Sequence, residues 1–518
     1  MESVDTQPSV SETELRVPGF LTTIEQNIEE RPLVVLMVLS ILYWGATIAI
    51  AARRPFWMDE IYTWHIVTSD SVWRILAQGF DLMPPLDFWL RQVVMPLAGN
   101  HELGLRLWSA VGIWAMCLAL FEYVRRRSSV LFGLIAFLLP LTSATYHFAA
   151  EARPYGSLLG FLAASMLCWQ LAGDGRRWAL PLFAICFTGT FWSHYYAVLA
   201  WPAFAAAELT RSWTRRKIDW AMAAAMFGAP ATLFLLLPFI REARQYSTNF
   251  WTTNSLSEAL QSYRVLFEPT FFPLGLILAV VPIIASVPAR HPAEESDRTW
   301  PLAEVVLPSV LMLVPLFGFI LARAGTNAFH ARYVQPAVLG TAVVVAYLCY
   351  RWTQPRRTVA LAVVCCLALG AAAFARDRYR RGSGERDQVE TKLALIERLA
   401  LRSPVLVENL VAFTQIQHYI SASTRGRVFL VRDWSRHEFE SMTSERLRTL
   451  IGANTRNDRD FYNATPEFYY IGSGRTAKSR LEELGLADGL SFELMTSPAD
   501  EIGSLGTDLY HVRIAPKR

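Results

Sequence analysis

Residues 32–65 read PLVVLMVLSILYWGATIAIAARRPFWMDEIYTWH. The first part, from Pro32 to Ala52, holds no charged residue over 21 positions. At about 1.5 Å of rise per helical residue, such a run is long enough to cross a hydrocarbon core of about 30 Å. Two arginines follow, and then two adjacent carboxylates, Asp59 and Glu60, stand among aromatic side chains. The stretch therefore predicts a membrane-spanning helix that leads into a charged segment at the membrane surface.

The rest of the chain repeats the apolar part of this pattern. Hydrophobic residues make up 53% of the 518 residues and charged residues only 18%, against about 25% in soluble domains. This composition excludes a water-soluble globule and a disordered chain. The sequence thus predicts a mostly α-helical, polytopic membrane bundle of about eleven transmembrane helices. We expect the spans at about 32–52, 103–124, 129–149, 154–172, 178–193, 195–210, 219–240, 271–288, 302–322, 334–350 and 358–375.

The segments between the spans alternate in character. One set is rich in arginine, as in Arg125-Arg126-Arg127, and the positive-inside rule places this set in the cytoplasm. The first span begins too far along the chain and runs too long for an ordinary cleaved signal, so we expect it to be a retained anchor. The predicted parts are a cytoplasmic tail at 1–31, a transmembrane domain at 32–375 with a long outward loop at 53–102, and a soluble extracytoplasmic domain at 376–518.

The C-terminal part, 376–518, has the composition of a soluble domain after an Arg- and Gly-rich linker at about 376–386. Its β-branched and aromatic runs predict strands, and its periodic runs predict helices, so we expect an α/β domain. All six cysteines lie in predicted spans, and no disulfide framework is expected. The predicted strands are 404–407, 427–431 and 467–471, and the predicted helices are 387–401 and 477–485.

Ionisable residues at membrane depth cost about 2.5–3.5 kcal/mol each, and here they gather on the outward side. Asp59 and Glu60 stand in an aromatic setting that partly excludes water. Such a setting raises the pKa of a carboxylate, which suits a general base that takes a proton from a hydroxyl group. The alternative is an interfacial helix with a solvated acidic edge. Further along, Pro84 and Pro85 predict the start of an amphipathic interfacial helix.

Other outward segments carry candidate ligands for an anion. A guanidinium binds a phosphate through two parallel hydrogen bonds, so Arg153 and Arg332 are candidate phosphate ligands. The alternatives are that Arg153 and Glu151 form an ion pair with each other, and that Arg332 snorkels to the lipid headgroups. His194 can orient a carboxylate, ligate a metal or contact a phosphate, and its alternative is a packed hydrogen-bonding residue.

The outward loop 241–270 contains several charged residues, Arg264 among them, and is a candidate lid over a cleft. Five separate outward segments thus bring charged, His or Tyr side chains to one membrane face. The cytoplasmic loops bring little besides arginine and lysine. This asymmetry predicts an outward-facing site.

Over about residues 32–375, the chain is similar to bacterial relatives of protein O-mannosyltransferases and of the aminoarabinose transferase that modifies lipid A. These are membrane glycosyltransferases of the GT-C class. Each motif is weak alone, and the resemblance lies in their order. The motifs are Asp59-Glu60, Pro84-Pro85-Leu86, Glu151-Ala152-Arg153-Pro154-Tyr155, His194-Tyr195-Tyr196 and Arg332-Tyr333.

The resemblance implies a bacterial inner-membrane enzyme that moves a sugar, with inversion, from a polyprenyl-phosphate carrier to an extracytoplasmic lipid, glycan or protein. Displacing the carrier phosphate needs a base for the acceptor and cations for the developing phosphate charge, which carboxylates and arginines supply. We predict Asp59 and Glu60 as catalytic residues. We predict Arg153, Arg332, Tyr333 and Arg264 as donor-phosphate ligands, and Glu151, Tyr155, His194, Tyr195 and His65 as substrate-positioning residues.

No metal or other cofactor is predicted, because a monophosphate leaving group needs a metal less than a diphosphate does. Some relatives bind zinc or another divalent ion, and His194 leaves that alternative open. The Asp458-Arg459-Asp460 triplet in the tail is expected to be a polar loop. Asp87 stands where relatives often have a tyrosine, which indicates a different acceptor or a different surface contact.

Two other functions fit part of the pattern. An oligosaccharide ligase or polymerase would also use a lipid-linked donor, and the mass of the transferred unit would distinguish it. A transporter or flippase would need ionisable groups in the middle of the spans, which are nearly free of charge here. Membrane lipids are partners in each case, and a net charge of +4 over 518 residues gives no reason to expect nucleic acid.

Overall fold

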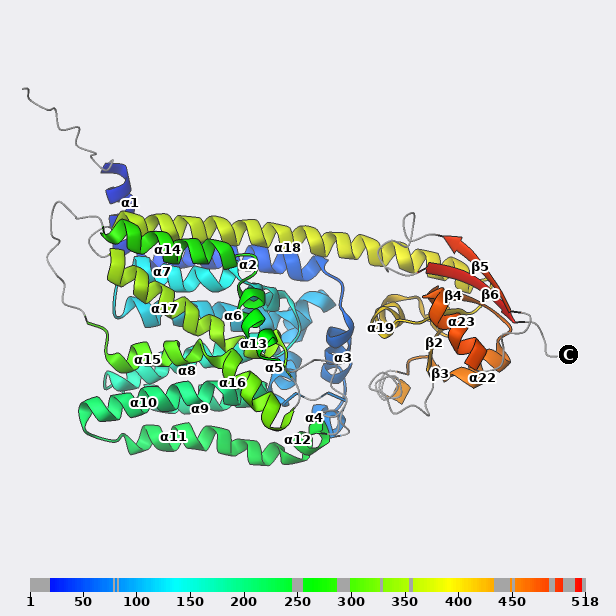
Figure 1. Ribbon diagram of the computed structural model, residues 1–518, viewed down its shortest axis with the longest axis horizontal. Coiled ribbons are helices and arrows are strands. Elements are labelled where there is room, and N and C mark those ends of the chain that lie inside the picture. The colour runs from blue at the N-terminus through cyan, green and yellow to red at the C-terminus, as the bar shows by residue number, and fades with distance from the viewer. Residues whose placement is uncertain are drawn as a thin grey trace, which may run out of the picture.

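The chain forms a bundle of roughly parallel helices with a smaller α/β domain at one end (Figure 1). The computed structural model describes residues 19–77, 80–81, 83–244, 255–286, 299–326, 329–353, 357–432, 448–449, 452–483, 490–496 and 508–514. The mostly helical membrane bundle and the α/β domain predicted from the sequence are both present.

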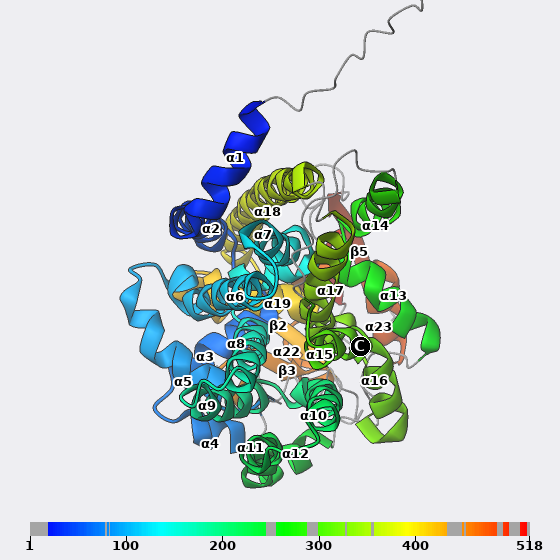
Figure 2. The same cartoon turned by 90° about the vertical axis from the view of Figure 1, so that its left-hand side faces the viewer.

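Six predicted spans each contain one helix, and Figure 2 shows most of these helices end-on and side by side. All six cysteines are free thiols in the bundle helices. The six helices are α2 (Pro32–Arg53), α6 (His101–Arg125), α8 (Tyr155–Gly173), α9 (Ala179–Ser193), α14 (Phe271–Ser286) and α17 (Pro336–Thr353).

Four predicted spans are interrupted. Proline lacks a backbone N–H and clashes with the preceding turn, and Pro140, Pro230 and Pro315 lie at or near three of the breaks. The bend after Thr142 is 74° and the bend after Leu311 is 51°. The interrupted spans are α7 (Val130–Leu138) with η2 (Leu139–Thr142) and η3 (Ala144–Ala150), η4 (Tyr195–Ala200) with α10 (Trp201–Arg215), α11 (Trp220–Ala231) with η5 (Thr232–Leu236) and α12 (Leu237–Arg244), and α15 (Leu302–Leu311) with α16 (Val314–Leu321).

The number of clear spans is lower than the eleven predicted. Within the described residues, five helices are long and apolar enough to cross a bilayer, or seven if each sharply bent pair counts as one span. Shorter or broken helices occupy most of the other predicted positions. Hydropathy locates these segments but does not report where a proline or a 3-10 turn divides them.

The first outward loop contains the expected short helices, α3 (Met58–Val67), α4 (Val72–Ala77), α5 (Leu86–Val94) and η1 (Met95–Leu97). Pro85 is the residue that caps α5, as the paired prolines predict. The remaining bundle elements are α1 (Gly19–Glu30), α13 (Leu256–Phe267), η7 (Ala322–Thr326) and η8 (Ala331–Val334).

The last span does not end near residue 375. Helix α18 (Arg357–Ala400) is continuous over 44 residues and passes through the segment predicted as a linker. An Asp377–Arg381 ion pair at 2.8 Å supports the helix one turn before Gly382. Gly382 lies against Arg54, where a Cβ would come within 3.3 Å of the Arg54 Cβ, so this glycine serves close packing instead of flexibility. Helix α18 therefore joins the bundle to the α/β domain without a break (Figure 1).

The α/β domain has one six-stranded sheet in the order β3-β2-β1-β4-β6-β5. The three predicted strands are confirmed as β1 (Val405–Val407), β2 (Val428–Arg432) and β4 (Glu467–Gly472), and Val405 and Val407 face one core while Leu406 faces the other. The Asp458 triplet opens a helix and is not a loop. The other elements are α19 (Leu410–Tyr419), α20 (Ala422–Arg425), β3 (Thr455–Asn457), α22 (Asp458–Ala464), α23 (Gly474–Glu483), β5 (Leu490–Thr496) and β6 (Asp508–Ile514).

Helices α6 and α8 pack closely through glycine. A Cβ on Gly112 would lie 2.2 Å from the Gly156 carbonyl oxygen, and one on Gly160 would lie 2.7 Å from the Gly112 oxygen. Small residues let membrane helices approach backbone to backbone. This contact fixes the start of α8, which carries Arg153 just before its first turn.

Candidate active site

Asp59 lies in the first turn of α3, directly after the first span. The helix begins after Trp57, whose extended backbone donates its N–H to Glu60 Oε2 at 3.4 Å. Neighbouring helical residues do not face the same side. The two adjacent carboxylates, Asp59 and Glu60, therefore point to different surroundings.

Glu60 is buried in an ion pair. Its exposed fraction is 0%, and Arg106 of α6 donates to both carboxylate oxygens, at 2.6 and 2.7 Å. The Ala152 N–H donates to the same carboxylate at 2.8 Å. Arg106 also holds the carbonyls of Ala51, Arg54 and Pro55. These contacts give Glu60 a structural role, and its catalytic role stays a prediction.

A second buried pair joins Asp87 to Arg91, one helical turn apart on α5. Arg91 Nε donates to Asp87 Oδ2 at 2.6 Å, and Arg91 Nη2 donates to the Arg153 carbonyl at 3.0 Å and to Ser109 Oγ at 2.8 Å. Asp87 is 1% exposed, and Ser157 donates to it. Asp87 therefore makes neither the acceptor contact nor the surface contact expected from the sequence.

The two buried pairs hold the turn 151–153 from both sides. Glu60 accepts the N–H of residue 152, Arg91 donates to the carbonyl of residue 153, and Ser109 Oγ donates to the carbonyl of residue 151 at 2.6 Å. Every residue of this turn is thus hydrogen-bonded to a buried polar side chain. The backbone position from which the Arg153 side chain extends is therefore fixed.

The Arg153 guanidinium lies between two carboxylates. Arg153 Nη1 donates to Asp81 Oδ2 at 2.9 Å and to Thr63 Oγ1 at 3.4 Å. Arg153 Nε is 3.8 Å from Asp59 Oδ2. The predicted pairing of Arg153 with Glu151 is replaced by pairing with Asp81 and Asp59.

Arg332 reaches the same carboxylate oxygen from η8. His330 caps this short helix by accepting the Arg332 N–H on Nδ1 at 3.2 Å. Arg332 Nη1 lies 3.4 Å from Asp59 Oδ2, and its guanidinium carbon lies 5.5 Å from the centre of the Tyr333 ring. Three segments far apart in sequence thus meet at one carboxylate.

The surroundings of Asp59 favour a basic carboxylate. Its side chain is 17% exposed, and burial raises the pKa above the ordinary value of 3.8. Arg153 and Arg332 oppose this increase, and Asp81 and Glu151 add to it. The net effect is a raised pKa, which is the property that a general base needs.

Three buried donors near this carboxylate have no hydrogen-bond partner within the described residues. They are Arg153 Nε, His194 Nε2 and Tyr195 Oη. Burial, followed by Arg153 and Arg332, lowers the pKa of His194 to about 3, so this histidine is neutral. Its Nδ1 accepts the Tyr196 N–H at 3.1 Å, which leaves the proton on Nε2. Buried donors rarely lack acceptors in proteins, so the group is suited to an oxygen-rich anion.

Aromatic rings form one wall around these donors. The His194 ring lies 5.4 Å from Tyr155 and 5.6 Å from Tyr333, and Tyr196 stacks on Tyr333 at 4.8 Å. Tyr155 and Tyr333 are both buried. The structure thus places Tyr155, His194 and Tyr333 together with Asp59, Arg153 and Arg332.

Comparison with known proteins shows which fold the chain shares. Residues 83–240 match the sequence family described as dolichyl-phosphate-mannose-protein mannosyltransferase. A crystal structure of ArnT from Cupriavidus metallidurans bound to undecaprenyl phosphate matches with a TM-score of 0.54 and 12% identity, over 94% of this chain and 99% of that one. The apo ArnT structure from that organism matches with a TM-score of 0.52 at the same identity and coverage. No curated protein matches by sequence.

The chain has the fold of these ArnT structures, which is the GT-C fold. The matched segment, 83–240, contains Arg153 and His194 but neither Asp59 nor Arg332. The GT-C class predicted from the order of the motifs is confirmed by these comparisons.

Glu151 belongs to a neighbouring cluster of the GT-C bundle. Its carboxylate contacts His147 Nε2 at 2.6 Å and Arg54 Nη1 at 3.8 Å, and Arg378 of α18 contacts the other nitrogen of His147. Glu151 therefore links the turn 151–153 to α18. Glu151 influences the site by raising the pKa of Asp59.

Two predicted site residues lie elsewhere in the GT-C fold. Arg264 is exposed on α13, and the described residues provide no ion pair for it. His65 lies on α3 beside His418 of the α/β domain, with ring centres 6.3 Å apart. Within the described residues, neither side chain forms a hydrogen bond or ion pair with Asp59 or Arg153, and their predicted roles in phosphate binding and substrate positioning stay predictions. Part of the loop predicted as a lid, 245–254, lies outside the described residues.

Sequence reasoning missed Asp81, Arg91 and Arg106. Asp81 bonds to Arg153, and the two arginines hold the turn that carries it. The signals were present, since Arg106 is a charged residue inside the predicted span 103–124 and Asp87 and Arg91 have helical spacing.

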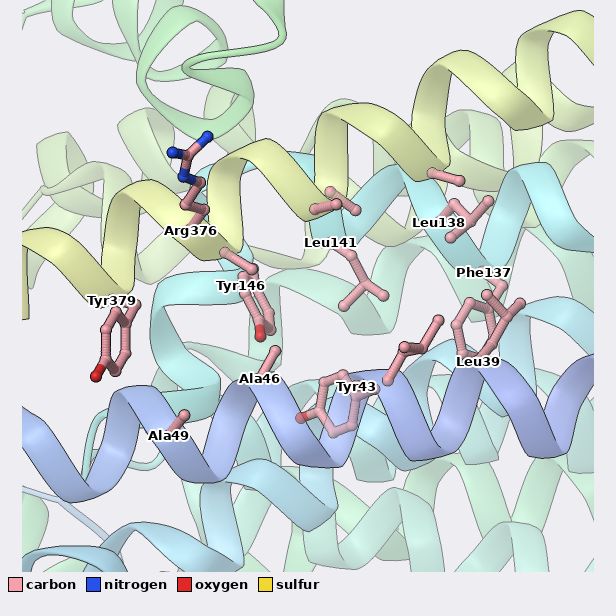
Figure 3. Close-up of a pocket in the computed structure, with 15 residues that line it drawn as sticks. Leu39, Tyr43, Ala46, Ala49, Phe137, Leu138, Leu141, Tyr146, Arg376 and Tyr379 are labelled. Carbon is pink, nitrogen blue, oxygen red and sulfur yellow. The ribbon is translucent and has the colours of Figure 1, made fainter.

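An apolar groove lies apart from this site. It has a volume of about 400 Å³ and lies between α2, the α7–η3 segment and α18, with Tyr379 near one end (Figure 3). Leu39, Tyr43 and Leu141 line it. It shares no residue with the Asp59 cluster.

Proposed function

We propose that this GT-C protein transfers one sugar from a polyprenyl-phosphate carrier to an extracytoplasmic lipid, glycan or protein, with inversion at the anomeric carbon. The observation that carries the proposal is the meeting of Asp59 Oδ2 with Arg153 and Arg332, next to the buried Nε2 of His194, which has no hydrogen-bond partner within the described residues. The ArnT structure that shares the fold is bound to undecaprenyl phosphate, and the matching sequence family is described by a dolichyl-phosphate donor. Both are lipid monophosphates.

The proposed reaction is a single displacement. Asp59 accepts the proton of the acceptor hydroxyl or amine while the acceptor atom bonds to the anomeric carbon. The bond from that carbon to the phosphate oxygen breaks, and the electron pair leaves with the phosphate. Arg153, Arg332 and the Nε2–H of His194 then stabilise the added negative charge, because preorganised donors act strongly in a site that excludes water.

We expect the transfer to need no metal. Two guanidiniums already supply positive charge where the phosphate would leave, and His194 has no free lone pair in the tautomer set by Tyr196. We therefore predict that a chelator leaves the initial rate unchanged. A rate that falls with chelator and returns with zinc or another divalent ion would contradict this expectation.

The test uses the full-length protein in proteoliposomes with labelled polyprenyl-phosphate sugars and a membrane fraction as acceptor. Asp59→Asn should lower transfer by a factor of about 10²–10⁴, the usual contribution of a general base. Asp70→Asn is the matched control, because Asp70 is an exposed carboxylate in the same loop. Near-normal turnover of Asp59→Asn would remove Asp59 from the mechanism. Products that carry more than one sugar per event would favour an oligosaccharide ligase.

A further inference from the structure

The α/β domain contacts the bundle at the segment that leads into Asp59. Both backbone polar groups of Phe56 bond to side chains of α19. The Phe56 N–H donates to Tyr419 Oη at 2.7 Å, and Gln415 Nε2 donates to the Phe56 carbonyl at 2.7 Å. Phe56 is fully buried and precedes Asp59 by three residues.

These two bonds complete the hydrogen bonding of the segment between α2 and α3. A buried backbone outside a helix or sheet needs partners for its N–H and C=O groups. Arg106, within the bundle, donates hydrogen bonds to the carbonyls of Arg54 and Pro55. Gln415 and Tyr419, in the α/β domain, bond to the carbonyl and the N–H of Phe56. The backbone that leads into Asp59 is thus fixed by two parts of the chain.

Helix α19 also covers one side of α3. Met58 and Tyr62, which are four residues apart and lie on one face of α3, pack against the apolar core of the α/β domain. Asp59 lies between them in sequence and points to the arginines of the bundle. Figure 1 shows α19 facing α3 where the domain and the bundle meet.

The Tyr419 hydroxyl is held in one hydrogen-bonding state. It donates to Glu102 Oε1 at 3.1 Å, and the same carboxylate oxygen accepts from Arg386 of α18 at 2.9 Å. Burial and the negative charge of Glu102 raise the pKa of Tyr419. The hydroxyl therefore keeps its proton for Glu102 and offers a lone pair to the Phe56 N–H.

We propose that Gln415 and Tyr419 are positioning residues for Asp59, and that the α/β domain acts on sugar transfer by holding the start of α3. This inference rests on the proposed function. The two side chains set where the Asp59 carboxylate stands relative to Arg153 and Arg332. The described residues of the domain would then contribute to the reaction through geometry, without a contact to the reacting atoms.

The test compares Gln415→Ala, Tyr419→Phe and the double variant with the parent protein in the proteoliposome assay. Tyr419→Phe removes one oxygen atom and keeps the ring contacts with His418 and Arg386. A displacement of about 1 Å can cost about 100-fold in rate, so we expect kcat of the double variant to fall by about 10- to 100-fold. Donor KM should change less, and the acid limb of the kcat/KM profile should move, because the pKa of Asp59 depends on its distances to the arginines.

The matched control is Gln417→Ala on the same helix. Gln417 donates to the Val428 carbonyl inside the α/β domain and does not bond to Phe56. This variant should lower the melting temperature of the protein and leave kcat and the pH profile of the folded fraction at parental values. Equal kinetic losses in Gln417→Ala would overturn the positioning role in favour of a purely structural one.

Parental kcat and an unmoved acid limb in the double variant would also overturn the proposal. The failure of the proposed function has a different signature. If Asp59→Asn stays active, the assignment of the base is wrong whatever the α19 variants do. If Asp59→Asn is inactive while the α19 double variant works normally, only the positioning role is wrong.

Discussion

A cluster of charged residues lies at each end of α8, and the two clusters differ in how closely their charged groups are paired. At the far end, Arg127 donates to both oxygens of Glu304, at 2.6 and 2.8 Å, and Asp174 accepts from Arg127 at 2.5 Å and from Arg126 at 2.7 Å. At the near end, one oxygen of Asp59 has only long contacts, 3.4 and 3.8 Å, to its two arginines. The ends are about 28 Å apart for a 19-residue helix.

The difference separates a structural cluster from a reactive one. Short, charge-assisted bonds to both oxygens of a carboxylate fix it in place. Glu60, adjacent to Asp59, is paired in that way. Asp59 has a raised pKa because it is buried and because its contacts to the two arginines are long. The long contacts of Asp59, and not the mere presence of charge, distinguish the end that carries the proposed site.

Removing an arginine should have the largest effect on the transfer rate, and only at the end of α8 near Asp59. Arg332→Ala is expected to lower transfer by about 10²–10³-fold, the usual cost of one donor to a developing anion. Arg126→Ala makes the same change at the far end and should leave the rate within about a factor of two to three. Initial rates at equal amounts of reconstituted protein measure both. Equal losses in the two variants would erase the distinction between the ends.

Breaking the far cluster should cost stability without changing chemistry. Glu304→Gln leaves Arg127 with a weaker partner and should lower the free energy of unfolding by about 1–3 kcal/mol. Thermal unfolding in detergent measures this loss. The turnover of the protein that remains folded should stay at the parental value, and a selective fall in kcat would give this end a catalytic role.

A smaller effect is expected from His194. His194→Asn keeps an acceptor for the Tyr196 N–H, since asparagine is a good helix cap, but removes the Nε2 donor. One neutral hydrogen bond contributes about 0.5–1.5 kcal/mol, so kcat/KM should fall by about 10-fold or less. Unchanged kcat/KM for the donor would mean that this donor does not contact the phosphate.

The pH profile gives the finest comparison. Asp59 acts as a base only when deprotonated, and its pKa is raised above 3.8, so kcat/KM should fall as the pH drops through a limb that lies above that of an ordinary aspartate. Arg332 lowers this pKa, so in Arg332→Gln the limb should move to still higher pH. A limb that moves to lower pH in this variant would contradict the assignment of the limb to Asp59.

The sequence predicted that Asp59, Arg153, His194 and Arg332 come together at one membrane face. The boundaries between apolar and polar segments indicate the face on which each residue lies. The sequence did not distinguish Asp59 from Glu60, because that choice depends on the rotation of α3 against α6 and on the position of Arg106. Pairings between distant segments are not encoded in local periodicity.

The same reason applies to other predictions. Arg264 is exposed on α13 and His65 contacts His418, and hydropathy carries no information on the direction of a side chain around a helix axis. The continuity of α18 was missed because Gly382 and Gly384 are typical of linkers. Only the contact with Arg54 explains why a glycine suits a helix there.

An unbroken α18 has a mechanical consequence. Its 44 residues correspond to about 66 Å of rigid rod, with one part among lipid-facing helices and the other in the fold that carries α19. Helices adapt to bilayer thickness by tilting. Because α18 is continuous, we expect a tilt of this helix to move the α/β domain, and we predict that the proposed transfer rate depends on the thickness of the bilayer.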